Sequence, residues 1–404
     1  MEQKFIIRTT YLEKIKAVMG TPDIKVITGV RRAGKSELLK SFIQFLKESE
    51  PKSNIIYVDL MDLENEPLKE YHALYTFVMG RYQEGVKNYV MVDEVSLCEN
   101  FELAINSLYN KKKFDIYITG SNAFLLSSDL TTLFTGRFFE IHVFPFSFKE
   151  YLSYTEDEDI DRAFDNYVLT GGMSGSYLYP IESDRAKYIQ GIFNTIIARD
   201  IKAKYHLPDD TALFKTADFL LDNISNLTSV NRISDILNAN QIPTNHNTIG
   251  NYAEYLCQAY LFYKIQRYDL KGKGILKTLE KYYEVDPAFR YARLGKRNMD
   301  YGRQYENLVA LELLRRGYSI YVGKLYQKEV DFVIMDQEKR IYIQVSDDIS
   351  SVETLAREKK PLLAIKDAYP KVILARTRHL KYDSDGIEIL DLARWLSGTE
   401  KTFF

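Results

Sequence analysis

The sequence offers little with which to bind a structural metal, form disulfides or cross a membrane. Among its 404 residues are two cysteines, Cys98 and Cys257, too few for a disulfide framework or a cysteine metal site. The five histidines show no H-x₃-H spacing. No apolar run approaches the roughly eighteen residues that a membrane-spanning helix needs, and the N-terminal segment lacks the apolar core of a signal peptide. We therefore expect a protein of the reducing cytoplasm that has no membrane partner.

An excess of charge of one sign is also missing. With 54 basic and 56 acidic residues the formal net charge is −2, so any binding of nucleic acid would need a local basic patch. Hydrophobic residues make up 46% of the chain and aromatic residues 13%, which supports real cores and argues against disorder. At this length we expect two or three domains.

The most informative segment spans residues 24–46. An apolar stretch rich in β-branched residues leads into a glycine-containing loop and then into an amphipathic helix, which is the context that the motif G-x-x-x-x-G-K-[ST] requires. Glycines let successive backbone N–H groups surround a phosphate, and the helix N-terminus adds its positive dipole end. The pattern therefore predicts a nucleoside triphosphate site, with ATP as the expected ligand. Its predicted binding residues are Gly29, Val30, Arg31, Arg32, Ala33, Gly34, Lys35, Ser36 and Glu37.

Two of these residues have predicted roles in the chemistry. Lys35 is expected to reach the β- and γ-phosphates, and the Ser36 hydroxyl to ligate Mg²⁺. Arg31 and Arg32 either touch phosphate or point outward.

Two later strands end in an aspartate that could also hold Mg²⁺. NIIYVDL carries Asp59, and YVMVDEV carries Asp93 followed by Glu94. The adjacent pair supplies two roles at once, with Asp93 on Mg²⁺ and Glu94 polarising the attacking water. We therefore favour this pair over Asp59; the alternative is an ordinary turn at a strand end.

Two further segments contribute candidates for catalysis. The strand FDIYITGSN ends in Ser121 and Asn122, either of which could hold the γ-phosphate or the lytic water. Arg137, just before another strand, could stabilise the transition state, in cis or from a neighbour in a homo-oligomer. A solvated or ion-paired surface arginine would explain it equally well.

The chain contains, in this order, the segments GVRRAGKS, VDE, ITGSN, TGR, FPFSFKEYL and LTGGM, followed by IIARDI, KYYEVDPAFR and EVDFV. With these segments it resembles a large family of bacterial and archaeal AAA-type ATPases with a C-terminal domain of unknown function. The resemblance covers nearly the whole chain. It implies an α/β fold with a three-layer P-loop AAA core, a winged helix and a restriction-endonuclease-like domain, and it suggests Arg137 as an arginine finger. One departure is Ser174, where a proline often follows GGM.

The expected organisation has four parts. An ATPase core covers residues 1–150, and a helical lid or linker covers 151–210. A winged-helix-like domain covers 211–290, and a nuclease-like α/β domain covers 291–404.

The last part departs from the nuclease pattern that it resembles. Endonucleases of the PD-(D/E)xK type place a helix Glu, a strand Asp and a (D/E)-x-K motif around Mg²⁺. Here the helix and strand offer Glu306 and Asp331, but the third element reads Gln344-Val345-Ser346. A neutral glutamine is a poorer metal ligand, and serine lacks the lysine's charge. We expect no cleavage, unless a lysine is recruited from elsewhere; Lys324 and Lys328 are near in sequence.

The winged-helix-like part could bind double-stranded DNA through its second helix and its wing. The helix opens with polar residues able to read bases, whereas phosphate attraction would come from wing lysines. Docking of protein, or a lid for the ATPase, is the alternative use. The residues concerned are Asn245, His246, Asn247, Thr248 and Asn251 in the helix and Lys271, Lys273 and Lys277 in the wing.

Taken together, these patterns predict a Mg²⁺-dependent ATPase that couples hydrolysis to the winged-helix and nuclease-like regions. A second hypothesis is a slow-turnover, nucleotide-gated scaffold that binds DNA or protein. A third is an ATP-regulated nuclease, which Gln344 and Ser346 argue against.

Overall fold

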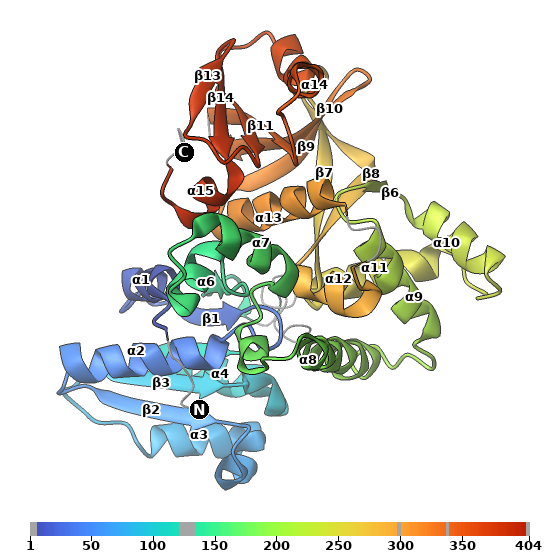
Figure 1. Ribbon diagram of the computed structural model, residues 1–404. Helices are drawn as coiled ribbons and strands as arrows, with labels where there is room; N and C mark the ends of the chain where they lie inside the picture. The colour runs from blue at the N-terminus through green and yellow to red at the C-terminus, as the bar shows by residue number, and fades with distance from the viewer. Residues whose placement is uncertain (1–5, 121–131, 133, 297–299, 337–338, 401–404) are drawn as a thin grey trace. The chain divides into compact units, whose positions relative to one another are not determined.

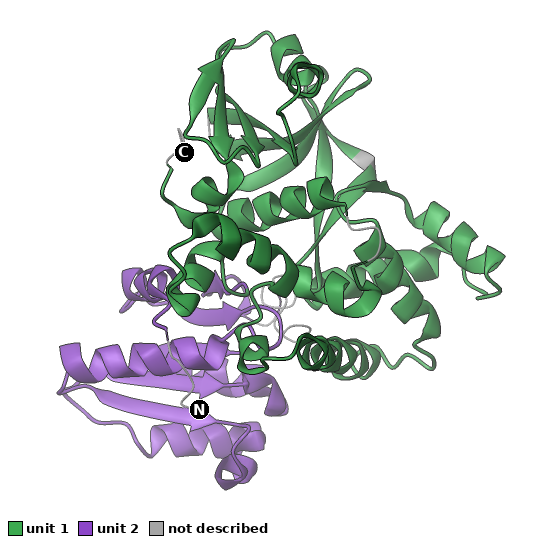
Figure 2. Ribbon diagram, in the orientation of Figure 1, with its two compact units in different colours: residues 1–4, 145–404 green, residues 5–144 purple. Residues whose placement is uncertain are grey.

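The computed structural model describes residues 6–120, 132, 134–296, 300–336 and 339–400 (Figure 1). These residues form two compact units (Figure 2). The N-terminal unit comprises Phe5–Phe144 and the C-terminal unit Pro145–Phe404. Within the described part of the chain, no helix has the length and apolar character needed to cross a membrane.

The N-terminal unit is built on a five-stranded sheet in the order β2-β3-β4-β1-β5, with every pair parallel. Its central strands are buried along their whole length, as parallel strands covered on both faces are. The five strands are those that the apolar runs predicted: β1 (Ile24–Thr28), β2 (Asn54–Asp59), β3 (Asn88–Asp93), β4 (Asp115–Thr119) and β5 (Phe138–His142).

Helices cover both faces of this sheet, because a parallel connection needs a crossover and helices supply it. α1 packs on α2 and α3 packs on α4, and Figure 1 shows α2 and α3 on opposite sides of the sheet. The result is a three-layer α/β unit in which the carboxyl ends of all five strands share one edge. The helical segments are α1 (Thr9–Ala17), α2 (Lys35–Ser49), η1 (Leu63–Lys69), α3 (Tyr71–Met79), η2 (Val95–Leu97) and α4 (Phe101–Asn110).

The C-terminal unit contains a mixed sheet of nine strands in the order β13-β14-β12-β11-β10-β9-β7-β8-β6. The strands are β6 (Leu227–Thr228), β7 (Phe262–Asp269), β8 (Gly274–Glu284), β9 (Ser319–Leu325), β10 (Lys328–Asp336), β11 (Lys339–Ser346), β12 (Lys371–Ala375), β13 (Tyr382–Ser384) and β14 (Ile387–Asp391). The helical segments are α6 (Phe148–Thr155), α7 (Ile160–Thr170), η4 (Ser174–Leu178), α8 (Glu182–Thr195), η5 (Ile196–Lys202), α9 (Thr211–Asp222), α10 (Val230–Ala239), α11 (His246–Gln258), α12 (Pro287–Leu294), α13 (Tyr301–Arg315), α14 (Val352–Ala364) and α15 (Leu392–Ser397).

This sheet runs across the boundary that was expected near residue 290. The hairpin β7–β8 belongs to the segment 211–290, yet β7 pairs in parallel with β9, with Arg267 opposite Val322. The segment 151–210 likewise joins this unit, because aromatic residues of α6 and α7 share a buried cluster with α13 and the C-terminal strands. The segments 211–290 and 291–404 therefore share one sheet, and the helices of 151–210 share its buried core.

The LTGGM motif forms a buried turn in the same unit. The Gly172 N–H donates to Asp286 Oδ2 at 2.5 Å. Gly171 has a φ of +66°, and a Cβ there would lie 1.9 Å from Asp286 Oδ1. Gly171 is thus required by the close approach of the turn to Asp286, which also caps α12, and a Cβ on Gly172 would lie 2.1 Å from the Phe146 carbonyl oxygen.

Candidate nucleotide-binding site

The loop between β1 and α2 has the backbone geometry of a phosphate cradle. Gly29 has a φ of +136°, and a Cβ on it would lie 2.1 Å from the Val143 carbonyl oxygen. Gly34, at a φ of +92°, precedes the first residue of α2. Both positions therefore need glycine, as the motif predicted. The helix N-terminus that follows leaves backbone N–H groups available to an anion.

Lys35 lies inside this loop. Its side chain is only 5% exposed, and Nζ donates to the carbonyl oxygens of Gly29 at 2.9 Å and Val30 at 3.1 Å. The ammonium is thereby held where the loop surrounds it. Next to it, Ser36 is half-buried and Glu37 is exposed, with Glu37 Oε1 3.0 Å from Lys40 Nζ.

The remaining loop residues differ in their surroundings. Val30 and Ala33 are buried, Arg31 is half-buried, and Arg32 is exposed with a left-handed φ of 64°. The buried Val30 and Ala33 and the left-handed Arg32 shape the loop. A direct contact of Arg31 or Arg32 with phosphate stays a prediction.

A residue outside the motif braces the loop from behind. Arg8 is buried, and its Nη1 donates to the carbonyl oxygens of Ala33 at 2.9 Å and Phe144 at 2.8 Å. Its guanidinium also lies 4.4 Å from the centroid of the Tyr11 ring. Sequence reasoning missed Arg8, because nothing local links it to a loop 25 residues away.

Beneath the loop, β1 and β5 place three polar side chains together. The Thr28 hydroxyl donates to Glu140 Oε1 at 2.6 Å and lies 3.0 Å from His142 Nδ1. Because the hydroxyl proton goes to the carboxylate, Nδ1 of the neutral imidazole has to donate to Thr28. Burial, and secondarily the Lys35 ammonium, lowers the pKa of His142 to about 3. His142 is therefore uncharged at neutral pH and adds no positive charge beside the loop.

Asp93 ends β3 and is held by a neighbour on β4. It is 2% exposed, and its Oδ1 accepts a hydrogen bond from the Thr119 hydroxyl. The Thr119 oxygen in turn accepts the backbone N–H of Glu94 at 3.0 Å. Glu94 has a left-handed φ of 52°, an uncommon conformation for a residue with a side chain. Thr119 therefore positions both members of the predicted Asp-Glu pair.

Thr119 itself was missed, although it is the last residue of the strand that was singled out. The predicted sensor residues Ser121 and Asn122 lie outside the described residues. The sequence does show a residue with a hydroxyl at the end of this strand. Its role could be recognised only from the order of the strands, which places β4 next to β3.

Asp59 lies one strand further from the phosphate loop than Asp93. The sheet order places β2 outside β3, with Asp59 opposite Asp93 in register. With strands about 4.8 Å apart, Asp59 is about 14 Å from the line of β1 and Asp93 about 10 Å. Asp59 Oδ1 also accepts the N–H of Met61 at 2.9 Å, in its own turn. This geometry favours Asp93, whose role as Mg²⁺ ligand stays a prediction.

Arg137 lies at the opposite edge of the sheet from the loop. Its carbonyl oxygen accepts the N–H of Ile24, the first residue of β1, at 3.0 Å. Its exposed side chain lies 3.4 Å from Asn110 Oδ1 and 5.5 Å from the centroid of the Tyr109 ring. The five residues of β1 span roughly 16 Å. This separation from the phosphate loop of its own chain favours action in trans over action in cis, and the role of Arg137 as an arginine finger stays a prediction.

Known proteins give the same assignment for the N-terminal unit. A profile of the AAA domain matches residues 21–152, and one of a domain of unknown function (DUF8612) matches residues 161–300. An uncharacterized protein of Haemophilus influenzae is 36% identical over 404 residues, with 98% of this chain and 100% of that protein covered. The chain belongs to the same family as the Haemophilus protein, and its N-terminal unit is a P-loop AAA domain.

Two more distant relatives extend the comparison of this AAA-domain protein. The uncharacterized protein MJ1544 of Methanocaldococcus jannaschii is 27% identical over 382 residues, covering 90% of this chain and 83% of that protein. The AMPPCP-bound DnaA of Aquifex aeolicus is 16% identical with a TM-score of 0.32, covering 62% of this chain and 89% of that one. A likeness of that strength adds nothing to the AAA assignment. The domain of unknown function that is matched covers the middle of the chain, whereas the resemblance placed such a domain at the C-terminal end.

In the C-terminal unit of the AAA-domain protein, the predicted nuclease-type residues meet a lysine that was not predicted. Glu306 on α13 and Asp331 on β10 both lie beside Lys281 of β8. Lys328 instead donates to the Lys360 carbonyl oxygen at 3.4 Å. Ser346 donates to the Asp348 carbonyl oxygen at 3.1 Å, so it takes no part in the group.

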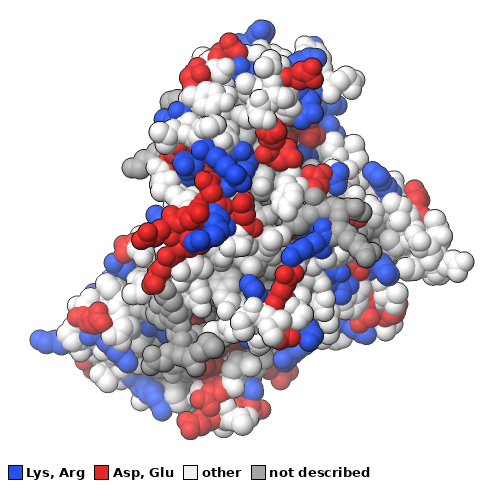
Figure 3. All heavy atoms as spheres, in the orientation of Figure 1, with Lys and Arg blue, Asp and Glu red and all other residues white. Residues whose placement is uncertain are grey.

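One of the polar residues at the start of the predicted DNA-reading helix caps that helix. Asn245 caps α11 by accepting the N–H of Thr248 at 3.0 Å. His246, Asn247 and Asn251 remain exposed. In the wing, Lys273 is exposed and Lys271 lies 4.8 Å from the centroid of the Tyr326 ring, whereas the side chain of Lys277 is outside the described part. On the face drawn in Figure 3, basic and acidic side chains are interspersed without an extended basic surface.

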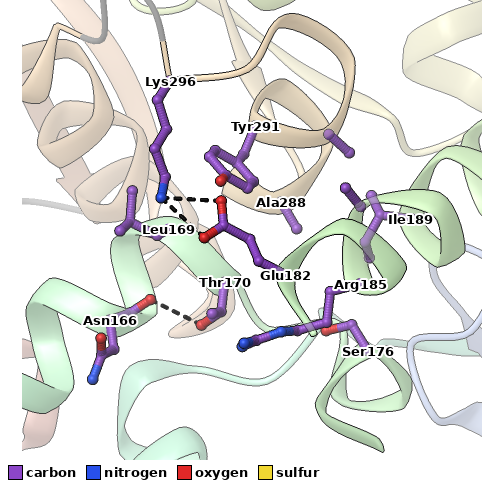
Figure 4. A pocket seen from close by; sticks show the side chains of 12 residues that line it. Asn166, Leu169, Thr170, Ser176, Glu182, Arg185, Ile189, Ala288, Tyr291 and Lys296 are labelled. Atoms are coloured by element: carbon purple, nitrogen blue, oxygen red, sulfur yellow. Dashed lines mark hydrogen bonds and ion pairs between the residues drawn. The ribbon is translucent and has the colours of Figure 1, made fainter. Parts of the chain in front are cut away.

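A cavity of about 130 Å³ lies between α7, α8 and α12 (Figure 4). An ion pair of 3.0 Å between Glu182 and Lys296 stands at its wall, and Arg185 and Ser176 also line it. Sites for drug-sized molecules are about 300–1,000 Å³. The cavity is therefore too small for a nucleotide and gives no alternative to the phosphate loop.

Proposed function

We propose that this AAA-domain protein is a Mg²⁺-dependent ATPase whose N-terminal unit binds and hydrolyses ATP. The observation that carries the proposal is the enclosed Lys35 ammonium at the start of α2. It lies within a loop whose two glycines permit the backbone conformation in which N–H groups can approach a phosphate. Phosphate oxygens would replace the carbonyl oxygens of Gly29 and Val30 as the partners of Lys35.

The residues at the strand ends fit Mg²⁺. The ion prefers hard oxygen ligands, keeps several waters, and uses one or two protein groups together with substrate phosphates. A hydroxyl from Ser36 and a carboxylate from Asp93 would be such a set. In the described ranges, no group of three or more His, Cys, Asp or Glu residues able to hold a metal is found, which agrees with a metal held largely by the nucleotide. Once bound, Mg²⁺ would neutralise charge on the phosphate oxygens.

In this proposal the chain's own residues divide the work of hydrolysis. Lys35 stabilises the charge on the phosphates, and Glu94 polarises the attacking water. Thr119 holds the backbone of Glu94 and the carboxylate of Asp93 in place through its hydroxyl. Its position on β4, between β3 and β1, supports the use of this edge as the reaction site.

Arg137 supports a homo-oligomer as the active form. It lies at the edge where the strands begin, away from the phosphate loop of its own chain, which supports a role at the nucleotide of another subunit. A groove of about 560 Å³ at the same edge is lined by Lys87, Lys112 and Lys113, which would attract the phosphates of a neighbour. Arg137 as an arginine finger in trans is the version of the prediction that we retain.

We further propose that ATP turnover switches the C-terminal unit, with residues 211–290 as a winged helix. The sequence of elements α9, β6, α10, α11, β7 and β8 supports it, because a winged helix consists of helices followed by a hairpin. The exposed polar start of α11 favours double-stranded DNA, while the few lysines of the wing favour a protein partner. A slow-turnover scaffold gated by ATP is the second candidate.

The proposal is tested by separating binding from turnover. Lys35→Ala should weaken ATP binding about 10- to 100-fold, since it removes a charged hydrogen-bond donor to phosphate. Glu94→Gln should retain ATP but lower kcat about 10²- to 10⁴-fold, because only the water-polarising carboxylate is lost. Binding is measured with a fluorescent ATP analogue and turnover by phosphate release.

Lys47→Ala is the matched control, because Lys47 is an exposed lysine in the last turn of the same helix. Native turnover in Glu94→Gln would refute the assignment of Glu94. ATP binding of native affinity in Lys35→Ala would refute the assignment of the phosphate loop. Tight binding with negligible turnover in the native protein, with or without duplex DNA, would favour the scaffold.

A further inference from the structure

In the C-terminal unit, one buried lysine lies among three carboxylates, of which two are buried and one, Glu329, is partly exposed. Lys281 of β8 is 3% exposed, and its Nζ is the centre of the group. It lies 2.9 Å from Glu306 Oε1 on α13 and 2.7 Å from Glu329 Oε1 on β10. Asp331 Oδ1, also on β10, is 3.9 Å away. We call these four residues the Lys281 cluster.

The cluster contains the two carboxylates that an endonuclease of the PD-(D/E)xK type would use to bind a divalent metal. Metal–oxygen distances for Mg²⁺ and Ca²⁺ are about 2.0–2.6 Å. An ammonium within 3 Å of both Glu306 and Glu329 fills the space that such an ion would need. Two of the carboxylate oxygens have further partners, since Glu306 Oε1 also accepts the Tyr283 hydroxyl at 2.7 Å and Asp331 Oδ2 accepts the Val345 N–H at 2.8 Å.

The third element of the nuclease pattern does not repair this. Gln344 is neutral, and Ser346 donates its hydroxyl to the Asp348 carbonyl oxygen. Among the residues that the structure describes, no group of three acidic or metal-ligating side chains is arranged to hold a metal. The residues present therefore do not fit a divalent cation.

The electrostatics of the cluster are those of a cation site that is already filled. Burial by itself works against a charged lysine, yet Glu306, Asp331 and Glu329 together raise the pKa of Lys281 above its ordinary value. Burial also raises the pKa of Asp331 and that of Glu306, and the Lys281 ammonium opposes this effect on both carboxyls. One ammonium thus serves oxygens that would be costly to bury alone.

We propose that the Lys281 ammonium is a permanent internal cation that takes the place of a divalent metal and closes this site to metal-dependent phosphodiester cleavage. The same ammonium joins the hairpin strand β8 to α13 and β10. A lysine from the segment 211–290 is therefore part of the core of the segment 291–404. The inference is independent of ATP hydrolysis.

The test measures Mn²⁺ binding to full-length, nucleotide-free protein that carries Asp93→Asn, which removes the metal position of the AAA domain. Electron paramagnetic resonance counts bound Mn²⁺, and thermal unfolding reports Tm. Four proteins are compared: the protein with Lys281, the variant Asp331→Asn that keeps Lys281, the variant Lys281→Met, and the double variant Lys281→Met with Asp331→Asn. Lys271→Met, in the exposed turn of the same hairpin, is the control for loss of a lysine.

We expect the Lys281 protein and the Lys271→Met control to bind no Mn²⁺ tightly and to keep the same Tm with or without it. Lys281→Met should lose several degrees of Tm in EDTA and recover part of the loss as Mn²⁺ is added. The added Asp331→Asn should abolish that recovery. Bound Mn²⁺ in the Lys281 protein that disappears with Asp331→Asn would overturn the proposal, and this readout does not require Lys281→Met to fold. A Lys281→Met protein that does not respond to Mn²⁺, whether folded or unfolded, would overturn it too.

Discussion

The hydroxyl of Thr119 should control turnover without controlling ATP binding. Thr119→Val keeps the shape of the side chain but leaves Asp93 Oδ1 without its donor and the Glu94 N–H without its acceptor. A hydrogen bond to a charged group contributes about 1.5–3 kcal/mol, and 1.4 kcal/mol changes a rate about tenfold. If that energy is lost from the transition state, kcat should fall roughly 10- to 150-fold.

ATP affinity should change less than about twofold in Thr119→Val, since Thr119 contacts the carboxylate and not the phosphate loop. The measurements are phosphate release at saturating Mg²⁺ and ATP, ATP binding by a fluorescent analogue, and Tm to show that the sheet is intact. Thr119→Ser restores the hydroxyl and should recover most of kcat. A native kcat in Thr119→Val, or an equal loss of kcat in the serine and valine variants, would show that turnover does not depend on the hydroxyl. Either result would refute the prediction.

Three further outcomes are expected. Arg137→Ala should bind ATP normally and lose roughly a thousandfold in turnover. Mixing this variant with Lys35→Ala protein should restore activity if the arginine acts in trans. Full turnover by a protein that light scattering shows to be a monomer would rule out action in trans. Burial raises the pKa of Glu284 to about 8, so its pKa in the folded state lies above that in the unfolded state. The free energy of unfolding should therefore fall by up to about 1.4 kcal/mol per pH unit from about pH 5 to 8. Glu284→Gln should flatten this slope in urea titrations, and an unchanged slope would contradict the prediction. Purified protein should not cut DNA with Mg²⁺ or Mn²⁺, and metal-dependent cutting that Asp331→Ala abolishes would show the opposite.

The sequence was sufficient for the parts of the site that are local. The phosphate loop follows from spacing alone, because a strand, two glycines, a lysine and a helix N-terminus are consecutive in the chain. The five strands of the AAA domain could be read from apolar runs, since strands buried on both faces need apolar side chains along their whole length. The choice of Asp93 with Glu94 used only adjacency at a strand end.

Residues that act across the sheet could not be read in this way. Arg8 reaches the loop from the N-terminal segment, and Thr119 reaches Asp93 from a strand 26 residues later. Arg137 was placed correctly before a strand, but the edge on which it lies depends on β5 running parallel to β1. Each of these contacts depends on the order and direction of strands, which local patterns do not specify.

The sequence by itself determined a P-loop α/β domain and a C-terminal part that departs from the nuclease pattern at Gln344 and Ser346. Only the tertiary structure decided that segments expected to be separate share a nine-stranded sheet, and that Lys281 lies between Glu306 and Glu329. The physical reason is that a buried charge needs a partner of opposite sign in space, not in sequence. The lysine that meets these carboxylates therefore comes from β8, whereas Lys328, which is nearer to them along the chain, donates to the Lys360 carbonyl oxygen.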